Sequence, residues 1–409
     1  MSKPLDDAAE AVGAGNRKWL TRNVWVLSWV SFAQDAASEM LYPLMPILLT
    51  SIFGAPAAIV GMIEGLAEGI AAATKLASSW LNRFIPRKWM VGIGYGAAGL
   101  GKVLVAAAGS WPMVLVGRLT DRVGKGMRSA PRDALLVQGS LKSHRGRVIG
   151  FHRTADTLGA VLGPILALLL LAAFNDRVQS VLWFAVIPAV TSTLLVLLVK
   201  DNEPSKRTAE RLAKENHTAP PLAVGAPEPL SAKLRLVLTA VIGFGIINFP
   251  DALVLLHVSQ VGFSVTEVVG AYLLYNISYA ALNFPAGMLA DKMRPSLVYA
   301  LGLLCFAITY GGMALTNNHN LTLLLVVIYG GYAACNDTVG KSWVSKLAPE
   351  TRQLWAQSLL QGFSGFSVLA AGLWAGAIWT LGSGLGTVPL AISGGLALVA
   401  AIAMAVSRL

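Results

Sequence analysis

The sequence predicts an all-α integral membrane protein with about 12 transmembrane helices in two pseudo-symmetric six-helix bundles. Three observations support this fold class. Of the 409 residues, 55% are hydrophobic and only 13% are charged, which is about half the charged share of a soluble domain. Apolar stretches of about 20 residues recur along the whole chain. A short charged motif also occurs twice, once on each side of a polar, proline-rich segment.

The expected spans form two sets, and each apolar stretch is long enough to cross about 30 Å of hydrocarbon as a helix. The first set comprises residues 24–50, 57–81, 89–108, 113–135, 148–172 and 181–199. The second set comprises residues 234–256, 265–290, 297–315, 321–344, 354–381 and 387–406. We therefore expect a chain that crosses the bilayer many times and leaves only short loops in water.

Polar stretches divide the chain into four parts. These are a cytoplasmic N-terminal segment (1–23), an N-terminal six-helix bundle (24–200), a cytoplasmic linker (201–233) and a C-terminal six-helix bundle (234–409). The first segment is polar and lacks the apolar core of a cleavable signal peptide. The linker is rich in proline and charge and contains no apolar run, as expected of a segment that lies outside the membrane.

The basic residues follow a membrane topology. The formal net charge of +11 could indicate a nucleic-acid partner, but the basic residues gather in alternate loops. They are Arg17, Lys18, Arg22, Arg83, Arg87, Lys88, Lys142, Arg145, Arg147, Lys206, Arg207, Arg211 and Lys214. The other loops contain almost no Lys or Arg, apart from Arg177. Positively charged loops stay in the cytoplasm. We therefore expect both termini and the linker to be cytoplasmic, a bacterial inner-membrane location and no nucleic-acid partner.

The charged motif occupies corresponding places in the two halves. The fourth expected span reads Asp121-Arg122-Val123-Gly124-Lys125, and the tenth reads Asp337-Thr338-Val339-Gly340-Lys341. A fainter match links residues 78–83, after the second span, to residues 287–292, after the eighth. Because both matches flank one linker, the sequence predicts an internal repeat with two halves of the same topology.

These features resemble the major facilitator superfamily over nearly the whole chain. Members have six plus six helices, a long cytoplasmic central loop and a loop signature Gly-x-x-x-Asp-[Arg/Lys]-x-Gly-[Arg/Lys] after helices two and eight. Gly287, Asp291 and Lys292 match the signature, whereas Arg294 stands where a second Gly is usual. The resemblance implies that Asp291 contributes to a lock at the cytoplasmic rim.

The fifth span carries a second family motif. Superfamily exporters that exchange a solute for protons tend to have Gly-x-x-x-Gly-Pro in helix five, and Gly159, Gly163 and Pro164 match it. The resemblance implies a secondary transporter that moves a small solute by alternating access, with proton-coupled efflux as the first hypothesis. Proton-coupled uptake of an anionic metabolite or chelate is the alternative. A membrane-embedded sensor or enzyme is a more distant one.

The first span places two carboxylates on one face. Asp35 and Glu39 are four residues apart and share that face with Tyr42, just before two prolines that should distort the helix. Charges in hydrocarbon are functional candidates by default. Neighbouring carboxylates also disfavour double ionisation, so one of the two could carry a proton. The alternative is a static network in which the charges of the first half neutralise one another.

Two further spans carry charged stripes. Glu64, Glu68 and Lys75 share one face of the second span at about 100° per residue. The fourth span carries Arg118, Arg122, Lys125 and Arg132 within a similarly narrow arc. A permanently charged guanidinium such as that of Arg118 can pair with a carboxylate or attract an anionic substrate.

The candidate residues fall into three groups. The proton-coupling candidates are Asp35, Glu39, Arg118, Glu64, Glu68 and Asp156. The candidates for the substrate cavity are Tyr42, Arg122, Tyr275, Asn276 and Tyr279. The gating candidates are Gly287, Asp291, Lys292, Gly159, Gly163, Pro164, Asp121, Lys125, Asp337 and Lys341.

Other signals lead to no prediction of a cofactor, a metal site or enzyme activity. The sequence around Lys125 lacks the spacing and the Ser or Thr of a phosphate-binding loop. His152 and His257 are isolated along the sequence, and a lone intramembrane His is more often structural than a metal ligand. The expected partners are therefore a small-molecule substrate, protons and the lipid bilayer, with the chain acting as a monomer.

Overall fold

The computed structural model describes residues 20–82, 84–137, 145–200, 231–348 and 353–407. Within these ranges the secondary structure is helical, and no strand occurs. Seven of the described helices are long and apolar enough to cross a membrane. The prediction of an all-α membrane protein is therefore confirmed, while the total of about 12 spans stays a prediction.

The helices of the first half begin with a span whose regular turns end at two prolines. The elements are α2 (Arg22–Leu41), η1 (Tyr42–Leu44), α3 (Met45–Ile47), η2 (Leu48–Ile52), α4 (Ala57–Leu81), α5 (Arg87–Ala106), α6 (Trp111–Val137), α7 (Arg145–Ala173), α8 (Val178–Leu195) and η4 (Val196–Leu198). Pro43 and Pro46 lack the N–H that an α-helix needs, so the chain changes to a tighter and then a wider turn. The expected distortion of the first span is present.

The second half contains one break that the sequence did not lead us to expect. Its helices are α10 (Ala232–Phe244), α11 (Asp251–Gln260), α12 (Val265–Lys292), α13 (Pro295–Leu315), α14 (His319–Leu347), α15 (Gln353–Ala377) and α16 (Thr387–Val406). The expected continuous helix over residues 234–256 is wrong, because residues 245–250 separate α10 from α11. Pro250 has no N–H and disfavours a helical conformation at Phe249, so a new helix starts at Asp251.

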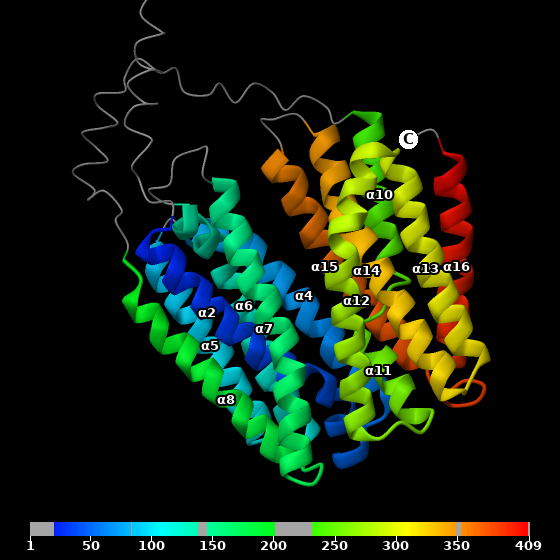
Figure 1. The fold of residues 1–409 in the computed structure, drawn as a ribbon, viewed down its shortest axis with the longest axis horizontal. Coiled ribbons are helices and arrows are strands. Elements are labelled where there is room, and N and C mark those ends of the chain that lie inside the picture. Colours follow the sequence, from blue (N-terminus) through cyan, green and yellow to red (C-terminus); the bar gives the residue numbers. More distant parts are fainter. Residues whose placement is uncertain (1–19, 83, 138–144, 201–230, 349–352, 408–409) are drawn as a thin grey trace, which may run out of the picture.

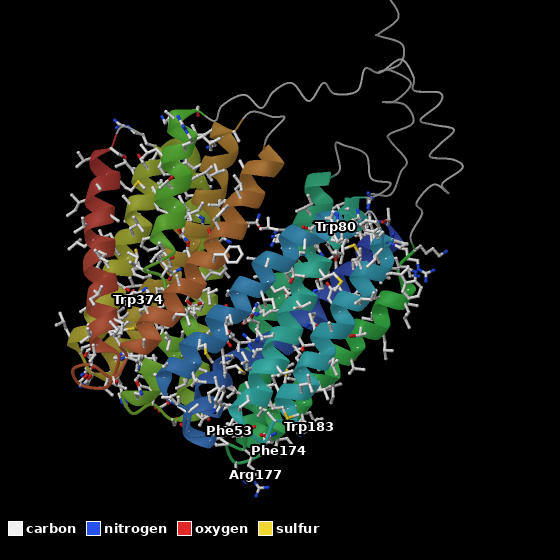
Figure 2. All side chains as sticks on the ribbon, turned by 180° about the vertical axis from the view of Figure 1, so that it is seen from behind. Phe53, Trp80, Phe174, Arg177, Trp183 and Trp374 are labelled. Atoms are coloured by element: carbon white, nitrogen blue, oxygen red, sulfur yellow. The ribbon has the colours of Figure 1, made fainter. Side chains whose placement is uncertain are left out.

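The two halves lie side by side and meet along α4 and α15 (Figure 1). Glycines bring these helices together, since a side chain at Gly61 would overlap the backbone carbonyl of Gly372. The halves also meet where Thr266 of α12 donates a 2.8 Å hydrogen bond to Asp176. Figure 2 shows Phe53, Phe174 and Arg177 at one end of the molecule and Trp80 at the other.

Candidate functional site

A polar cavity of about 170 Å³ lies where helices of both halves meet. Its walls come from α2, η1, α4 and α6 in the first half and from α11 and α12 in the second. The lining residues are Asp35, Ser38, Glu39, Tyr42, Glu68, Arg118, Asp121, Arg122, Lys125, Arg128, Asp251 and Tyr272. Since one enclosed water needs about 10–15 Å³ of such space, the cavity suits a solute of roughly ten non-hydrogen atoms.

The wall formed by α4, α5 and α6 is a matched network of ion pairs. The Arg118 guanidinium donates to both oxygens of Glu64, with Nε–Oε1 at 2.8 Å and Nη2–Oε2 at 2.5 Å. Lys102 Nζ lies 2.9 Å from Asp121 Oδ1, and Arg118 Nη1 lies 3.7 Å from Asp121 Oδ2. All four residues are more than nine-tenths buried. Each charge therefore has a partner, which is the arrangement that makes buried ions tolerable.

Two further charged residues of this wall, Arg122 and Glu68, line the cavity. Arg122 Nη2 lies 3.2 Å from Glu68 Oε1 and 4.0 Å from Glu64 Oε2. The expected stripes of the second and fourth spans thus face each other, and their charges pair. Lys75 instead donates a hydrogen bond to Gln361 of α15 in the other half. The structure brings together the candidates Glu64, Glu68, Arg118 and Arg122.

The two carboxylates of α2 differ from this network because they have no ion pair. Among the described residues, no Lys or Arg nitrogen lies within 4.0 Å of Asp35 or Glu39. Glu39 Oε2 instead accepts a hydrogen bond from the Tyr272 hydroxyl at 2.5 Å. Tyr272 belongs to α12, so this bond joins the two halves across the cavity. An ionised carboxylate removed from water without a counter-ion is unfavourable by several kcal/mol.

The glycine motif of α7 positions the face of α2 that carries these carboxylates. A side chain at Gly159 would approach Phe32, and one at Gly163 would lie 2.8 Å from Glu39 Cβ. Both glycines therefore allow α7 to pack directly on α2. Pro164 follows within the same helix and is buried. The structure gives this motif a packing role, while its role in gating stays a prediction.

Asp251 is a cavity residue that the sequence analysis missed. It begins α11 after the break, and its Oδ1 accepts a 2.7 Å hydrogen bond from the Tyr329 hydroxyl. The ring of Tyr275 stacks on that of Tyr329 beside this carboxyl. The rule that marks intramembrane charges as functional candidates would have found Asp251, because it lies inside the expected seventh span.

Tyrosines of α12 connect Glu39 with the surroundings of Asp251. The Tyr272 ring lies 5.5 Å from that of Tyr42 and 5.9 Å from that of Tyr275, and Tyr275 stacks on Tyr329 at 5.2 Å. Of the other predicted cavity residues, Tyr279 stacks on Tyr275 but does not line the cavity. Asn276 also lies outside the lining, since its side chain donates to the Tyr272 carbonyl within its own helix.

Two cations on α6 line the cavity without an ion-pair partner among the described residues. Lys125 and Arg128 both lie in the wall, one turn apart. The Arg128 guanidinium stacks on the Tyr95 ring, 4.3 Å from its centroid, and its buried Nη1 has no hydrogen-bond partner. Both groups can therefore receive an anion that enters the cavity.

The remaining candidates lie away from the cavity or outside the described side chains. Asp156 lies on α7 with its Oδ1 3.6 Å from His152 Nε2, beyond hydrogen-bonding distance, and lines no part of the cavity. Gly287 and Lys292 lie in the last turns of α12. The side chains of Asp291, Asp337 and Lys341 lie outside the described residues. Their equivalence to residues of the first half and their gating roles stay predictions.

Comparisons with known proteins agree with the fold described above. The family model "Major Facilitator Superfamily" matches residues 27–274 and 236–409. The chain is 30% identical over 375 residues to an uncharacterized MFS-type transporter of Methanocaldococcus jannaschii, covering 90% of both chains. It is 26% identical over 237 residues to a probable 4-methylmuconolactone transporter of Cupriavidus pinatubonensis, covering 56% of this chain and 53% of that protein.

Two kinds of solved structure share the fold. The nucleoside transporter NupG matches with a TM-score of 0.74 and 14% identity, covering 94% of this chain and 98% of the other. The peptide transporter POT in complex with sulfate matches with a TM-score of 0.72 and 14% identity, covering 98% of this chain and 97% of the other. At these identities the likeness concerns the fold alone.

Proposed function

The chain belongs to the major facilitator superfamily, and from this premise we propose that it is a proton-coupled carrier whose proton binds at Glu39. Family and fold make the chain a multi-pass secondary transporter of small molecules and not an enzyme. The proposal adds the coupling ion, the class of solute and the direction of transport.

In the proposed cycle, the parts 24–200 and 234–409 rock against each other around the cavity, joined by the cytoplasmic linker 201–233. The chain acts as a monomer in a bacterial inner membrane, with both termini cytoplasmic. Asp291 at the end of α12 holds one arrangement closed at the cytoplasmic rim.

The observation that carries the proposal is the hydrogen bond from Tyr272 to Glu39 across the two halves. A hydrogen bond to an ionised carboxylate is about twice as strong as one to a neutral group. Protonation of Glu39 therefore weakens this tie between the halves. By linkage, this hydrogen bond lowers the affinity of Glu39 for its proton, compared with an equally buried Glu39 in an arrangement without the bond.

The contacts between the halves support inward proton movement. Thr266 bonds to Asp176, and Gly61 packs on Gly372, toward the end that carries Phe53 and Phe174. The basic loops predict that this end is extracellular. The arrangement tied there releases solute and the Glu39 proton toward the cytoplasm, so protons move inward.

The cavity chemistry favours a small anionic solute. Lys125 and Arg128 are cations without an ion-pair partner among the described residues, and they lie on the same wall. Asp35 and Glu39 line the same cavity as these two cations. A solute carboxylate or phosphate brings a negative charge into the cavity, which favours the protonated form of Glu39. Anion and proton therefore enter together, which supports uptake by symport.

Efflux by proton antiport is the second candidate. It rests on the Gly159 to Pro164 motif, which resembles that of proton-exchanging exporters and packs on the helix that carries Glu39. Direction separates the candidates, since an imposed inward proton gradient accumulates an anion in symport and expels it in antiport.

The test uses the purified full-length chain in proteoliposomes that contain a pH-sensitive dye. Candidate solutes are short mono- and dicarboxylates, aromatic acids and inorganic phosphate. Glu39→Gln should abolish transport driven by a pH gradient and keep solute exchange, because exchange needs no net proton movement. Asp35→Asn is tested separately in the same way.

The matched control is Glu267→Gln. Glu267 is exposed in the capping box of α12 and does not line the cavity, so both activities should persist. Gradient-driven transport at the wild-type level in Glu39→Gln would remove this carboxyl from the mechanism and transfer the role to Asp35.

A further inference from the structure

Asp251 is the one cavity carboxyl of the second half among the described residues, and we propose that it is a second proton-binding site. The two halves then each carry one proton, on Glu39 and on Asp251. This inference rests on the proton coupling of the proposed function and extends it to the number of protons moved.

The surroundings of Asp251 contain no counter-ion among the described residues. Tyr42 lines the same cavity, Tyr329 donates to the carboxyl, and the rings of Tyr275 and Tyr310 contact that of Tyr329. The charged residues of the same cavity include Glu68, which Arg122 holds at 3.2 Å. No Lys or Arg nitrogen of the described residues lies within 4.0 Å of Asp251, and an ionised carboxyl without an ion-pair partner among phenols is disfavoured.

The start of α11 and the Tyr329 hydroxyl both favour the anion. The N-terminus of a helix stabilises a nearby carboxylate. That effect is smaller than the penalty for burying an ion without a counter-ion. The two influences oppose each other, which is the condition for a group that gains and loses a proton as the halves move.

The hydrogen-bonding partner of Asp251 suits both protonation states. A tyrosine hydroxyl donates to a carboxylate and accepts from a carboxylic acid. Tyr329 can therefore satisfy Asp251 with or without its proton. An Arg or Lys partner, such as those in the network of α4 to α6, would instead hold a carboxylate in its charged form.

One helix links the two proton sites. Tyr272 and Tyr275 are neighbours on α12. Tyr272 bonds Glu39, and Tyr275 stacks on Tyr329 beside Asp251. A movement of α12 that parts Tyr272 from Glu39 also displaces Tyr275. The two protons are therefore taken up and released in a coupled manner.

The test is infrared difference spectroscopy of the purified protein during a pH titration, because it needs no transported solute. Protonated carboxyls show a carbonyl stretch that shifts in heavy water. The signals of the wild type should include one from Glu39 and one from Asp251. Glu39→Gln should remove one of them, and Asp251→Asn should remove the other.

Two further variants keep the test decisive. Tyr329→Phe keeps the carboxyl but removes a hydrogen bond, so the Asp251 signal should persist at a shifted frequency. Glu267→Gln alters an exposed carboxyl in the capping box of α12, outside the cavity lining, and should leave both signals unchanged. An unshifted signal in Tyr329→Phe, or an unchanged spectrum in Asp251→Asn, would overturn the second site.

Transport gives an independent readout. Protons moved per solute should fall by half in Asp251→Asn proteoliposomes, whereas an unchanged ratio would refute a transported second proton. If the wild type moves solute without protons, the proposed function fails even where the infrared signal of Asp251 is present. The two ideas therefore fail through different measurements.

Discussion

The two halves share a topology but fill their sides of the cavity with different chemistry. The first half presents a network of buried ion pairs on α4, α5 and α6, in which Arg118, Glu64, Lys102 and Asp121 all have partners. The second half presents tyrosines and Asp251. Matched charges resist a change of protonation, whereas a carboxyl among phenols permits one. This difference supports the proposal that the ion-pair network of α4, α5 and α6 stays fixed during transport. Protons would then bind to the cavity carboxyls outside that network.

The largest expected effect comes from disrupting the buried ion-pair network of α4, α5 and α6. Removing one partner of the buried pair, as in Arg118→Leu or Glu64→Leu, leaves an uncompensated charge and should destabilise the protein by about 3–5 kcal/mol. The double variant should lose less than the sum of the two single variants. Thermal unfolding in detergent measures all three.

Tyr329, in the second half, supplies the matched comparison for that prediction. Tyr329→Phe removes a hydrogen bond to Asp251 and should destabilise the protein by about 1 kcal/mol.

The double variant of Arg118 and Glu64 also shows how the first prediction could fail. If the losses of stability in the two single variants add up in the double variant, the ion pair contributes nothing as a unit.

The next effect concerns the contact that positions Glu39. Gly163→Ala would bring a new methyl group within 2.8 Å of Glu39 Cβ, so α2 and α7 must move apart. Overpacking of this kind is destabilising by about 1–3 kcal/mol. The control on the same helix is Gly150→Ala, where a new methyl group meets no atom within 4 Å. Equal thermal stability of the two variants would refute the packing role of the motif.

Periodicity along the sequence predicted the helix faces but not the partners across the cavity. The stripes of the second and fourth spans were placed on single faces, and the structure pairs Glu64 and Glu68 with Arg118 and Arg122. Lys75 belongs to the same expected face, yet it bonds Gln361 in the other half. The helical period fixes the direction of each side chain around its own helix. It carries no information about which residues of another helix that side chain contacts.

Contacts between the halves could not be predicted from one sequence. Glu39 and Tyr272 are 233 residues apart, and no local pattern links them. Asp251 was missed although it lies inside the expected span over residues 234–256, because the rule on intramembrane charges was applied to the spans of the first half alone. The break before Asp251 depends on Pro250, and a proline in a membrane helix can produce either a kink or a new start.

The last prediction tests whether the solute binds to Lys125 and Arg128, the two cavity cations without an ion-pair partner among the described residues. Arg128→Lys keeps the charge but loses the planar group that stacks on Tyr95, 4.3 Å from the ring centroid. Affinity for an anionic solute should fall by about tenfold, corresponding to about 1.4 kcal/mol. Lys88→Arg is the control, because Lys88 donates to the Leu197 carbonyl outside the cavity lining. The measurement is the concentration dependence of counterflow with the anion that the proteoliposome assay identifies. Unchanged affinity in Arg128→Lys would show that the solute does not use this guanidinium, and recognition would then rest on Lys125 and the tyrosines of the opposite wall.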